Sequence, residues 1–154
     1  MGGAAASGDT VRVTIERRFD AAPEEVFDAW LDPDVARRWL FTSPGSAISR
    51  VGIDASVGGS FVFVDQRDGK TVEHQGTYLE INRPHRLVFR FWTAEEPSAP
   101  DLLTVMITPD GEGCVLTLHH DLHPYWAKFV DFTNKEWTQM FVLLDGVLAE
   151  ASMR

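Results

Sequence analysis

The residues most able to do chemistry form a histidine-rich segment, His119-His120-Asp121-Leu122-His123. Histidine and aspartate this close together suggest a metal site, but neighbouring residues of a strand point to opposite faces of a sheet. His119 and His120 therefore cannot enter one site together, and no second cluster supplies the remaining ligands that zinc requires. We predict no metal and no cofactor. His120 is in phase with Leu116 and Leu118, so we expect it to face the core.

A catalytic function would need inward-facing polar groups that lie close together and have shifted pKa values. The candidates are Tyr78, Arg90, His120 and Asp65. Arg90 alternates with phenylalanines and is predicted to face solvent, while Asp65 stands just before a turn and is predicted to be solvated. The single cysteine, Cys114, has no evident partner and is interpreted as a small buried hydrophobic residue. We therefore predict no catalytic residue.

The elements that must position these residues are indicated by apolar periodicity. Thr10–Asp20 alternates between apolar and polar residues, which predicts a half-buried strand. Pro23 and Pro33 each suit the first position of a short helix, and Asp32 can cap the second one. From Ser46 to Leu122 the period stays at two, with turn signals that divide the segment into about six strands, which is typical of an antiparallel meander.

The C-terminal segment changes to a helical period. Its apolar stripe consists of Trp137, Met140, Phe141, Leu144 and Leu148. The helix is predicted to begin near Tyr125, just after Pro124, and its stripe must be buried against the largest apolar surface available, which is one face of the sheet. We predict an α+β fold in which a curved antiparallel sheet of about seven strands wraps around this long helix, with two short helices after the first strand.

Length and charge limit the classes of function. The chain has 154 residues, a formal net charge of −9 and one cysteine. This length suits a single domain, which we place at residues 10–154 after a disordered Gly/Ala-rich tail, residues 1–9. An acidic chain repels phosphate groups, so we expect no nucleic-acid partner, and no apolar run reaches the ~20 residues that span a membrane. A lone cysteine suits a reducing compartment, and we expect a cytoplasmic location.

Several segments, taken in order, resemble the helix-grip fold of the START-like (SRPBCC) superfamily, and more closely the bacterial homologues of the activator of heat shock protein 90 ATPase. The segments are Phe19-Asp20-Ala21-Ala22-Pro23-Glu24-Glu25-Val26-Phe27, Trp30-Leu31-Asp32-Pro33, Trp39, Val57-Gly58-Gly59-Ser60-Phe61, Gly76-Thr77-Tyr78-Leu79-Glu80-Ile81, Pro84-His85-Arg86-Leu87-Val88-Phe89 and Glu136-Trp137. They extend from about Val11 to Glu150. The family often has glycine before the last tryptophan, where this chain has Glu136.

The resemblance implies an apolar cavity between the helix and the curved sheet. A single aromatic residue is most simply explained by core packing, but a sheet that grips one helix leaves concave space of the kind that binds ligands. Trp137 and Phe141 are expected on the helix wall, and the strand phenylalanines on the floor. The residues predicted to contact a ligand are Phe27, Trp30, Trp39, Phe61, Phe63, Tyr78, Phe89, Phe91, His120, Trp137, Phe141 and Leu144.

Three functions fit this resemblance. The first is a binding protein for a small apolar molecule or lipid, without catalysis. The second is a cyclase or dehydratase, as found elsewhere in the superfamily, and it rests on Tyr78 and His120 alone. The third is a co-chaperone that binds a heat shock protein 90 homologue, suggested by the family name. We rank them in this order, because fold alone does not choose a function. The ligand and the oligomeric state stay open.

Overall fold

The fold is that of a computed structural model, which describes residues 10–93 and 100–152. The predicted tail, residues 1–9, lies outside the described residues. The elements in chain order are β1 (Val11–Phe19), α2 (Pro23–Asp28), α3 (Pro33–Ala36), β2 (Ala47–Ile53), β3 (Ser60–Arg67), β4 (Lys70–Asn82), β5 (Arg86–Thr93), β6 (Asp101–Asp110), β7 (Gly113–Leu122), the 3-10 helix η1 (Pro124–Phe129) and α4 (Val130–Ser152). Within the described ranges, no helix is long and apolar enough to cross a membrane.

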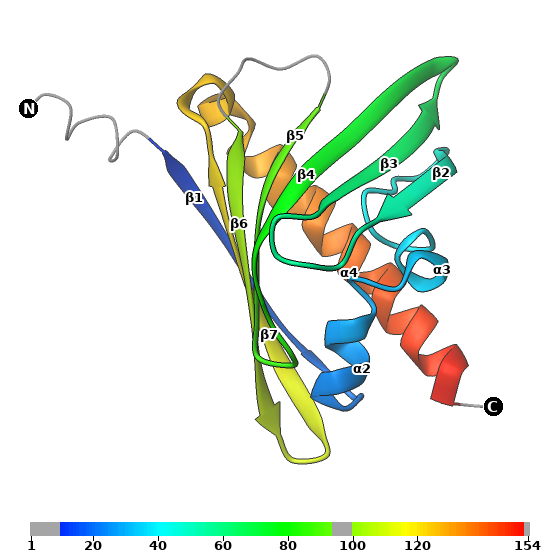
Figure 1. Ribbon diagram of the computed structural model, residues 1–154, viewed down its shortest axis with the longest axis vertical. Helices are drawn as coiled ribbons and strands as arrows, with labels where there is room; N and C mark the ends of the chain where they lie inside the picture. The colour runs from blue at the N-terminus through cyan, green and yellow to red at the C-terminus, as the bar shows by residue number, and fades with distance from the viewer. Residues whose placement is uncertain (1–9, 94–99, 153–154) are drawn as a thin grey trace, which may run out of the picture.

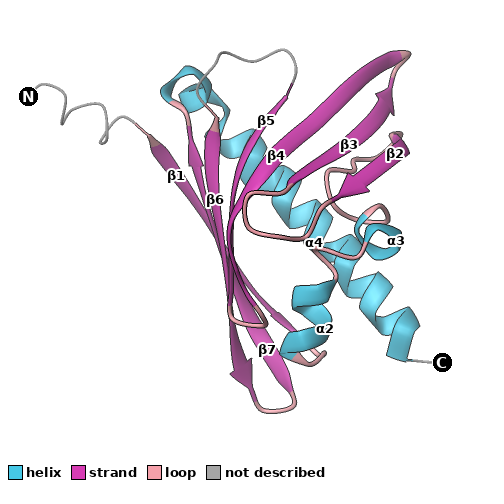
Figure 2. Ribbon diagram, viewed as in Figure 1, coloured by secondary structure: helices cyan, strands magenta, loops and turns pink. Residues whose placement is uncertain are grey.

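The seven strands form one antiparallel sheet in the order β1-β7-β6-β5-β4-β3-β2. The first strand pairs with the last one along its whole length, from Val11 opposite Leu122 to Phe19 opposite Cys114. The sheet curves around α4, which runs diagonally across one face, and α2 and α3 lie on the same side (Figures 1 and 2). The predicted helix-grip architecture is confirmed, including the two short helices after the first strand.

The two short helices begin at the prolines that the sequence indicated. Pro23 occupies the first turn of α2 together with Glu24 and Glu25, whose negative charges suit the positive end of the helix dipole. At α3 the Asp32 carboxylate accepts a hydrogen bond of 3.0 Å from the backbone N–H of Asp34. These local signals fix where the chain leaves β1 and how it returns toward the sheet.

The long helix begins later than the sequence predicted. Residues 124–129 form η1, and regular α-helix begins at Val130. The His123 side chain caps η1 by accepting a hydrogen bond of 3.1 Å from the Tyr125 N–H. A tight turn of this kind is common at the N-terminus of an α-helix, and it turns the chain from β7 onto the sheet face.

The helix stripe predicted from the sequence is buried against the sheet. Trp137, Phe141 and Leu144 are at most 2% exposed. Phe141 packs edge-on against Phe19 of β1 with ring centroids 6.0 Å apart, and Arg17 of β1 donates a hydrogen bond of 2.9 Å to an Asp145 carboxylate oxygen. Contacts from both an apolar stripe and its flank therefore hold α4 on β1.

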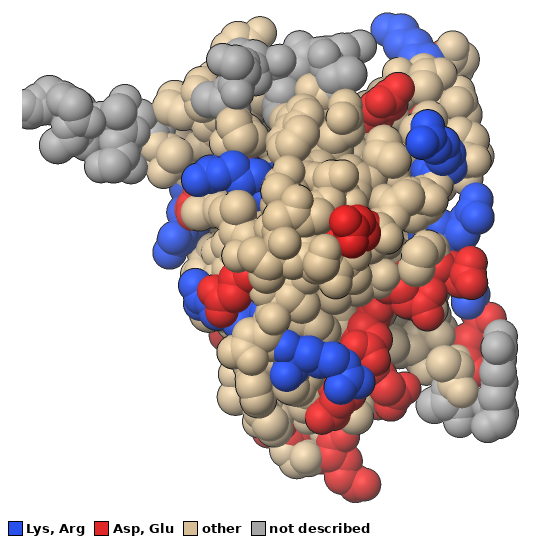
Figure 3. All heavy atoms as spheres, in the orientation of Figure 1, with Lys and Arg blue, Asp and Glu red and all other residues tan. Residues whose placement is uncertain are grey.

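The charged side chains are unevenly distributed on the surface. Figure 3 shows acidic side chains gathering toward the end of the molecule where α2 lies, with basic side chains scattered over the rest of this face. Arg83 crosses the acidic end with hydrogen bonds of 2.8 and 2.9 Å to the Asp28 carboxylate. Exposed pairs of this kind contribute little to stability, so the fold depends on its core.

Gly76 provides a test of how tightly the sheet packs under the helix. A Cβ atom on Gly76 would lie 2.2 Å from the Arg90 carbonyl oxygen and 2.3 Å from the Phe61 ring. Gly76→Ala should therefore lower the free energy of unfolding by about 2 kcal/mol in urea denaturation, because backbone must shift. Gly146→Ala in α4, where a Cβ meets no heavy atom within 4 Å, should raise it by up to about 1 kcal/mol. Equal effects of the two changes would contradict this packing.

Candidate functional site

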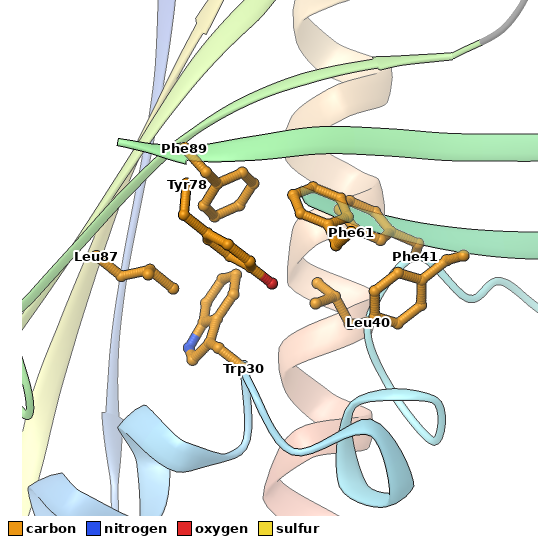
Figure 4. A pocket seen from close by; sticks show the side chains of 8 residues that line it. Trp30, Leu40, Phe41, Phe61, Tyr78, Leu87 and Phe89 are labelled. Carbon is orange, nitrogen blue, oxygen red and sulfur yellow. The ribbon is translucent and has the colours of Figure 1, made fainter. Parts of the chain in front are cut away.

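The interior between helix and sheet is filled by aromatic side chains. The Trp30 and Trp39 rings meet edge to face with centroids 4.8 Å apart, and Trp30 also lies 5.8 Å from Trp137. The hollow that remains has a volume of about 10 Å³ and is lined by Trp30, Leu40, Phe41, Phe61, Phe63, Tyr78, Leu87 and Phe89 (Figure 4). Such a space holds one water molecule at most.

A larger hollow opens at the end of the sheet where β5, β6 and β7 meet the start of α4. We call it the aromatic groove. Its volume is about 250 Å³, and it is lined by Phe91, Thr93, Asp101, His120, Leu122, Trp126, Phe129, Phe132 and Thr133. Apolar walls with a few polar groups are typical of ligand sites. Of the twelve residues predicted to contact a ligand, Phe91 and His120 line this groove.

His120 forms the back of the aromatic groove and is 4% exposed. Its Nε2 lies 2.8 Å from Oδ2 of Asp101, and its Nδ1 lies 2.9 Å from Nε1 of Trp137. An indole nitrogen can only donate, so Nδ1 must accept, and the ring proton sits on Nε2 and is donated to Asp101. The contacts thus fix a neutral imidazole in one tautomer.

The same chain of hydrogen bonds reaches the backbone. Asp101 Oδ1 accepts a hydrogen bond of 2.8 Å from the His123 N–H, at the point where β7 leads into η1. We call the arrangement of Asp101, His120 and Trp137 the clamp. It ties β6, β7 and α4 together in a buried site, where unpaired polar groups are costly and paired ones define a geometry.

The orientation of the histidines agrees with strand parity. His120 points inward, whereas His119 on the opposite face has its Nδ1 3.0 Å from the Thr14 hydroxyl at the surface. Arg90 is exposed, as predicted. Cys114 is fully buried, and burial is the largest cause of the raised pKa of its thiol. Burial likewise raises the pKa of Tyr78, so its hydroxyl keeps its proton.

The prediction that Asp65 is solvated is wrong. Its side chain is fully buried and pairs with the Arg67 guanidinium. The β3–β4 hairpin continues past Asp65, which pairs with Val72, so Asp65 stays in phase with the inward-facing Phe63. His74 of β4 lies beside it, with Nε2 3.9 Å from Asp65 Oδ2, which is too long for a hydrogen bond.

A second open hollow, of about 530 Å³, lies on the outer side of α4. It is lined by Arg37, Arg38, Thr42, Ser43, Pro44, Ser46, Ile48, Thr138, Gln139, Val142 and Leu143. We call it the outer groove. Arg38 is paired there with Glu150 at 2.7 Å. The outer groove is larger than the aromatic groove, but none of its lining residues is buried, so its polar groups are accessible to water.

Sequence reasoning missed Asp101 and Phe41. Asp101 had a usable signal, because it alternates in phase with the buried Leu103 and Val105 at the start of β6. Phe41 had none, since it lies in the loop after α3, where neither period applies. Its ring is 4% exposed and packs among strand aromatics.

Comparisons with known proteins agree with this fold. A family model described as Activator of Hsp90 ATPase homolog 1-like protein matches residues 20–149. Among curated proteins, none matches the chain. A solved structure from Chromobacterium violaceum is 24% identical, with 89% of this chain and 96% of that one covered and a TM-score of 0.81. One from Rhodobacter sphaeroides is 25% identical, with 92% and 94% covered and a TM-score of 0.80. A protein of unknown function from Staphylococcus aureus is 21% identical, with 94% and 97% covered and a TM-score of 0.82.

The clamp can be tested with a matched pair of tryptophan substitutions. Trp137→Phe removes the N–H that His120 accepts, whereas Trp30→Phe removes an N–H with no partner among the described residues. Both lose the same ring volume. Trp137→Phe should therefore be more destabilising by about 1 to 3 kcal/mol in urea denaturation, because it leaves a buried acceptor unpaired. A smaller cost for Trp137→Phe than for Trp30→Phe would rule out the clamp as a stabilising contact.

His74 should make stability depend on pH. Burial, aided by the positive charge of Arg67, lowers the pKa of His74 to about 4, below the 6.5 of an exposed histidine. The unfolded state then binds more protons, so stability is full above pH 6.5 and falls as pH drops toward 4. Between pH 7 and 5 the wild type should lose about 2 kcal/mol more than His74→Phe. Equal losses, measured by denaturation at both pH values, would show that His74 is protonated without cost.

Proposed function

The chain belongs to the family of Activator of Hsp90 ATPase homolog 1-like proteins, and we propose that it binds a small apolar molecule in the aromatic groove. The observation that carries this proposal is the groove itself, in which an aromatic wall surrounds the buried pair of His120 and Asp101. Apolar walls supply affinity, and a few fixed polar groups orient the ligand.

The polar contribution of the groove comes from Asp101. Each of its carboxylate oxygens already accepts one hydrogen bond, from His120 and from the His123 N–H. A carboxylate oxygen can accept more than one, so Asp101 retains capacity for an O–H or N–H group of a ligand. The groove therefore suits an apolar molecule with a single donor group better than a pure hydrocarbon.

The aromatic residues at the mouth of the groove support the same proposal. Phe129 and Phe132 are 37% and 57% exposed, and their ring centroids lie 6.4 Å apart. Trp126 packs on Phe129 with centroids 5.6 Å apart. Exposed aromatic rings that gather around a hollow provide apolar surface that a ligand would remove from water.

A cyclase or dehydratase has less support. A general base needs a nitrogen or oxygen that is free to take a proton from the substrate. Both ring nitrogens of His120 are engaged, one by Trp137 and the other by Asp101. A base role for His120 would require the clamp to open during each turnover.

A co-chaperone function is the remaining candidate, and the outer groove is the surface that fits it. Val142 and Leu143 are 54% and 43% exposed there, next to Arg37 and Arg38. Apolar side chains beside arginines are common in protein interfaces. The family description names an activator of Hsp90 ATPase, and the partner would be an Hsp90 homologue.

One pair of variants separates the two grooves. Thr133→Trp should fill the aromatic groove, and Val142→Trp should fill the outer one. In the wild type, an apolar library should shift tryptophan emission and raise the melting temperature, because a ligand that binds only the folded state stabilises it. Thr133→Trp should weaken the best hit at least tenfold, and Val142→Trp should leave it unchanged.

Two outcomes of this experiment would contradict the proposal. One is that no member of the library alters the wild-type melting temperature. The other is that Val142→Trp, and not Thr133→Trp, abolishes binding. In a separate pull-down with an Hsp90 homologue, loss of binding in Val142→Trp but not in Thr133→Trp would favour the co-chaperone function instead.

A further inference from the structure

Phe41 has an unusual backbone for a bulky residue. Its φ of +59° lies in the left-handed region, which residues with a side chain adopt only at a cost. Hydrogen bonds to both the N–H and the carbonyl oxygen of Phe41 hold this conformation. The Phe41 N–H donates to Sδ of Met140 at 3.1 Å, and Arg67 donates to the Phe41 carbonyl oxygen at 3.5 Å. The loop after α3 therefore holds a strained residue that drives one ring into the interior.

The ring of Phe41 is stacked nearly parallel to three rings from adjacent strands. Its centroid is 5.8 Å from Phe61 of β3, 5.0 Å from His74 of β4 and 4.9 Å from Phe91 of β5, at interplanar angles of 15°, 5° and 7°. We call these three residues the ring platform. Figure 4 shows Phe41 reaching toward Phe61 from the loop beside α3. The space that the Phe41 ring occupies beside these three rings therefore suits another aromatic ring.

Polar atoms without partners lie beside the platform. Neither ring nitrogen of His74 nor Oδ1 of Asp65 has a hydrogen-bond partner within residues 10–93 and 100–152, although both side chains are more than nine-tenths buried. Buried polar atoms without partners are rare in folded proteins, and each calls for a specific explanation. An aspartate oxygen and a neutral imidazole together offer acceptors, and the imidazole offers one donor.

The platform adjoins the aromatic groove. Phe91 belongs to the platform and also lines the groove, and its ring lies 6.2 Å from that of His120. A ligand in the groove would therefore contact Phe91, whereas the Phe41 ring covers Phe61 and His74, the other two residues of the platform. If the Phe41 ring left, the platform would extend the groove inward toward Asp65 and His74.

We propose that Phe41 is an internal substitute for the ligand: a planar aromatic molecule carrying an O–H or N–H group displaces its ring, stacks on the ring platform and donates a hydrogen bond to Oδ1 of Asp65. This inference rests on the proposed function and specifies the class of molecule bound. Displacement releases the strained backbone of Phe41 and gives the unpaired Asp65 oxygen a donor. The buried ring area lost by Phe41 is replaced by that of the ligand.

The test removes the Phe41 ring from the platform and compares the binding of two probes of similar size. Phe41→Gly removes the ring, and glycine tolerates the positive φ. Phenol and toluene then serve as probes, with dissociation constants measured by calorimetry. A plain apolar cavity favours toluene, because burying an unpaired hydroxyl is unfavourable. We expect Phe41→Gly to bind phenol at least tenfold more tightly than the wild type does, and more tightly than it binds toluene. Adding Asp65→Leu, which removes the acceptor, should reverse the order of the two probes.

Phe19→Ala is the matched control, because it removes a buried ring that packs against Phe141 and lies outside the platform. This variant should prefer toluene. The inference is overturned if Phe41→Gly binds neither probe more tightly than the wild type, or if it shares the toluene preference of the control. Should Phe41→Gly not fold, Phe41→Leu permits the same comparison with a smaller opening and the same expected order.

The outcome is separable from that of the proposed function. Wild-type binding that Thr133→Trp blocks, together with no phenol preference in Phe41→Gly, overturns only the inference about Phe41. Phenol preference in Phe41→Gly, with no library member bound by the wild type, supports the platform and contradicts the proposed function.

Discussion

The arrangement of the whole site depends on one chain of buried hydrogen bonds, from Trp137 to His120 to Asp101. Its donors and acceptors match only if α4, β6 and β7 keep their relative positions. An apolar stripe alone would let a helix slide or rotate on a sheet, since hydrophobic contact has no direction. The clamp supplies direction at the start of α4, as the Arg17–Asp145 hydrogen bond does further along the helix, and it also places the Asp101 carboxylate at the back of the aromatic groove.

The clamp has a consequence for the interior. It holds the Trp137 indole against the aromatic side chains that follow from α2 and α3, and this packing leaves about 10 Å³. The residues that make the interior apolar are therefore the same ones that fill it. Space for a ligand remains at the edge, where the strands diverge from the start of α4, and further space depends on moving a ring such as Phe41. A helix-grip protein of this kind can thus be well packed and still hold an apolar site.

Much of the fold could be predicted because periodicity reports the burial of an element. The helical stripe and the alternating strands fixed the layers, and proline and aspartate marked the short helices. Apart from the start of the long helix, the errors occurred at strand ends. Asp65 was assigned to solvent because a turn follows it, yet its parity with Phe63 was the stronger signal. Asp101 carried the same kind of signal. Phe41 could not be found, because a positive φ in a loop leaves no periodic trace.

The most direct test of ligand binding at the aromatic groove is a titration of the five indole N–H signals by two-dimensional ¹H–¹⁵N NMR, using the best hit from an apolar library. Trp126 lines the groove and Trp137 contacts the imidazole at its back. We predict that the Trp126 and Trp137 signals shift together and saturate with ligand concentration, while the signal of Trp39, which is buried against Trp30 and Phe141, does not shift. Unchanged Trp126 and Trp137 signals at saturation, with shifts confined to backbone amides around Arg37 and Val142, would contradict the account.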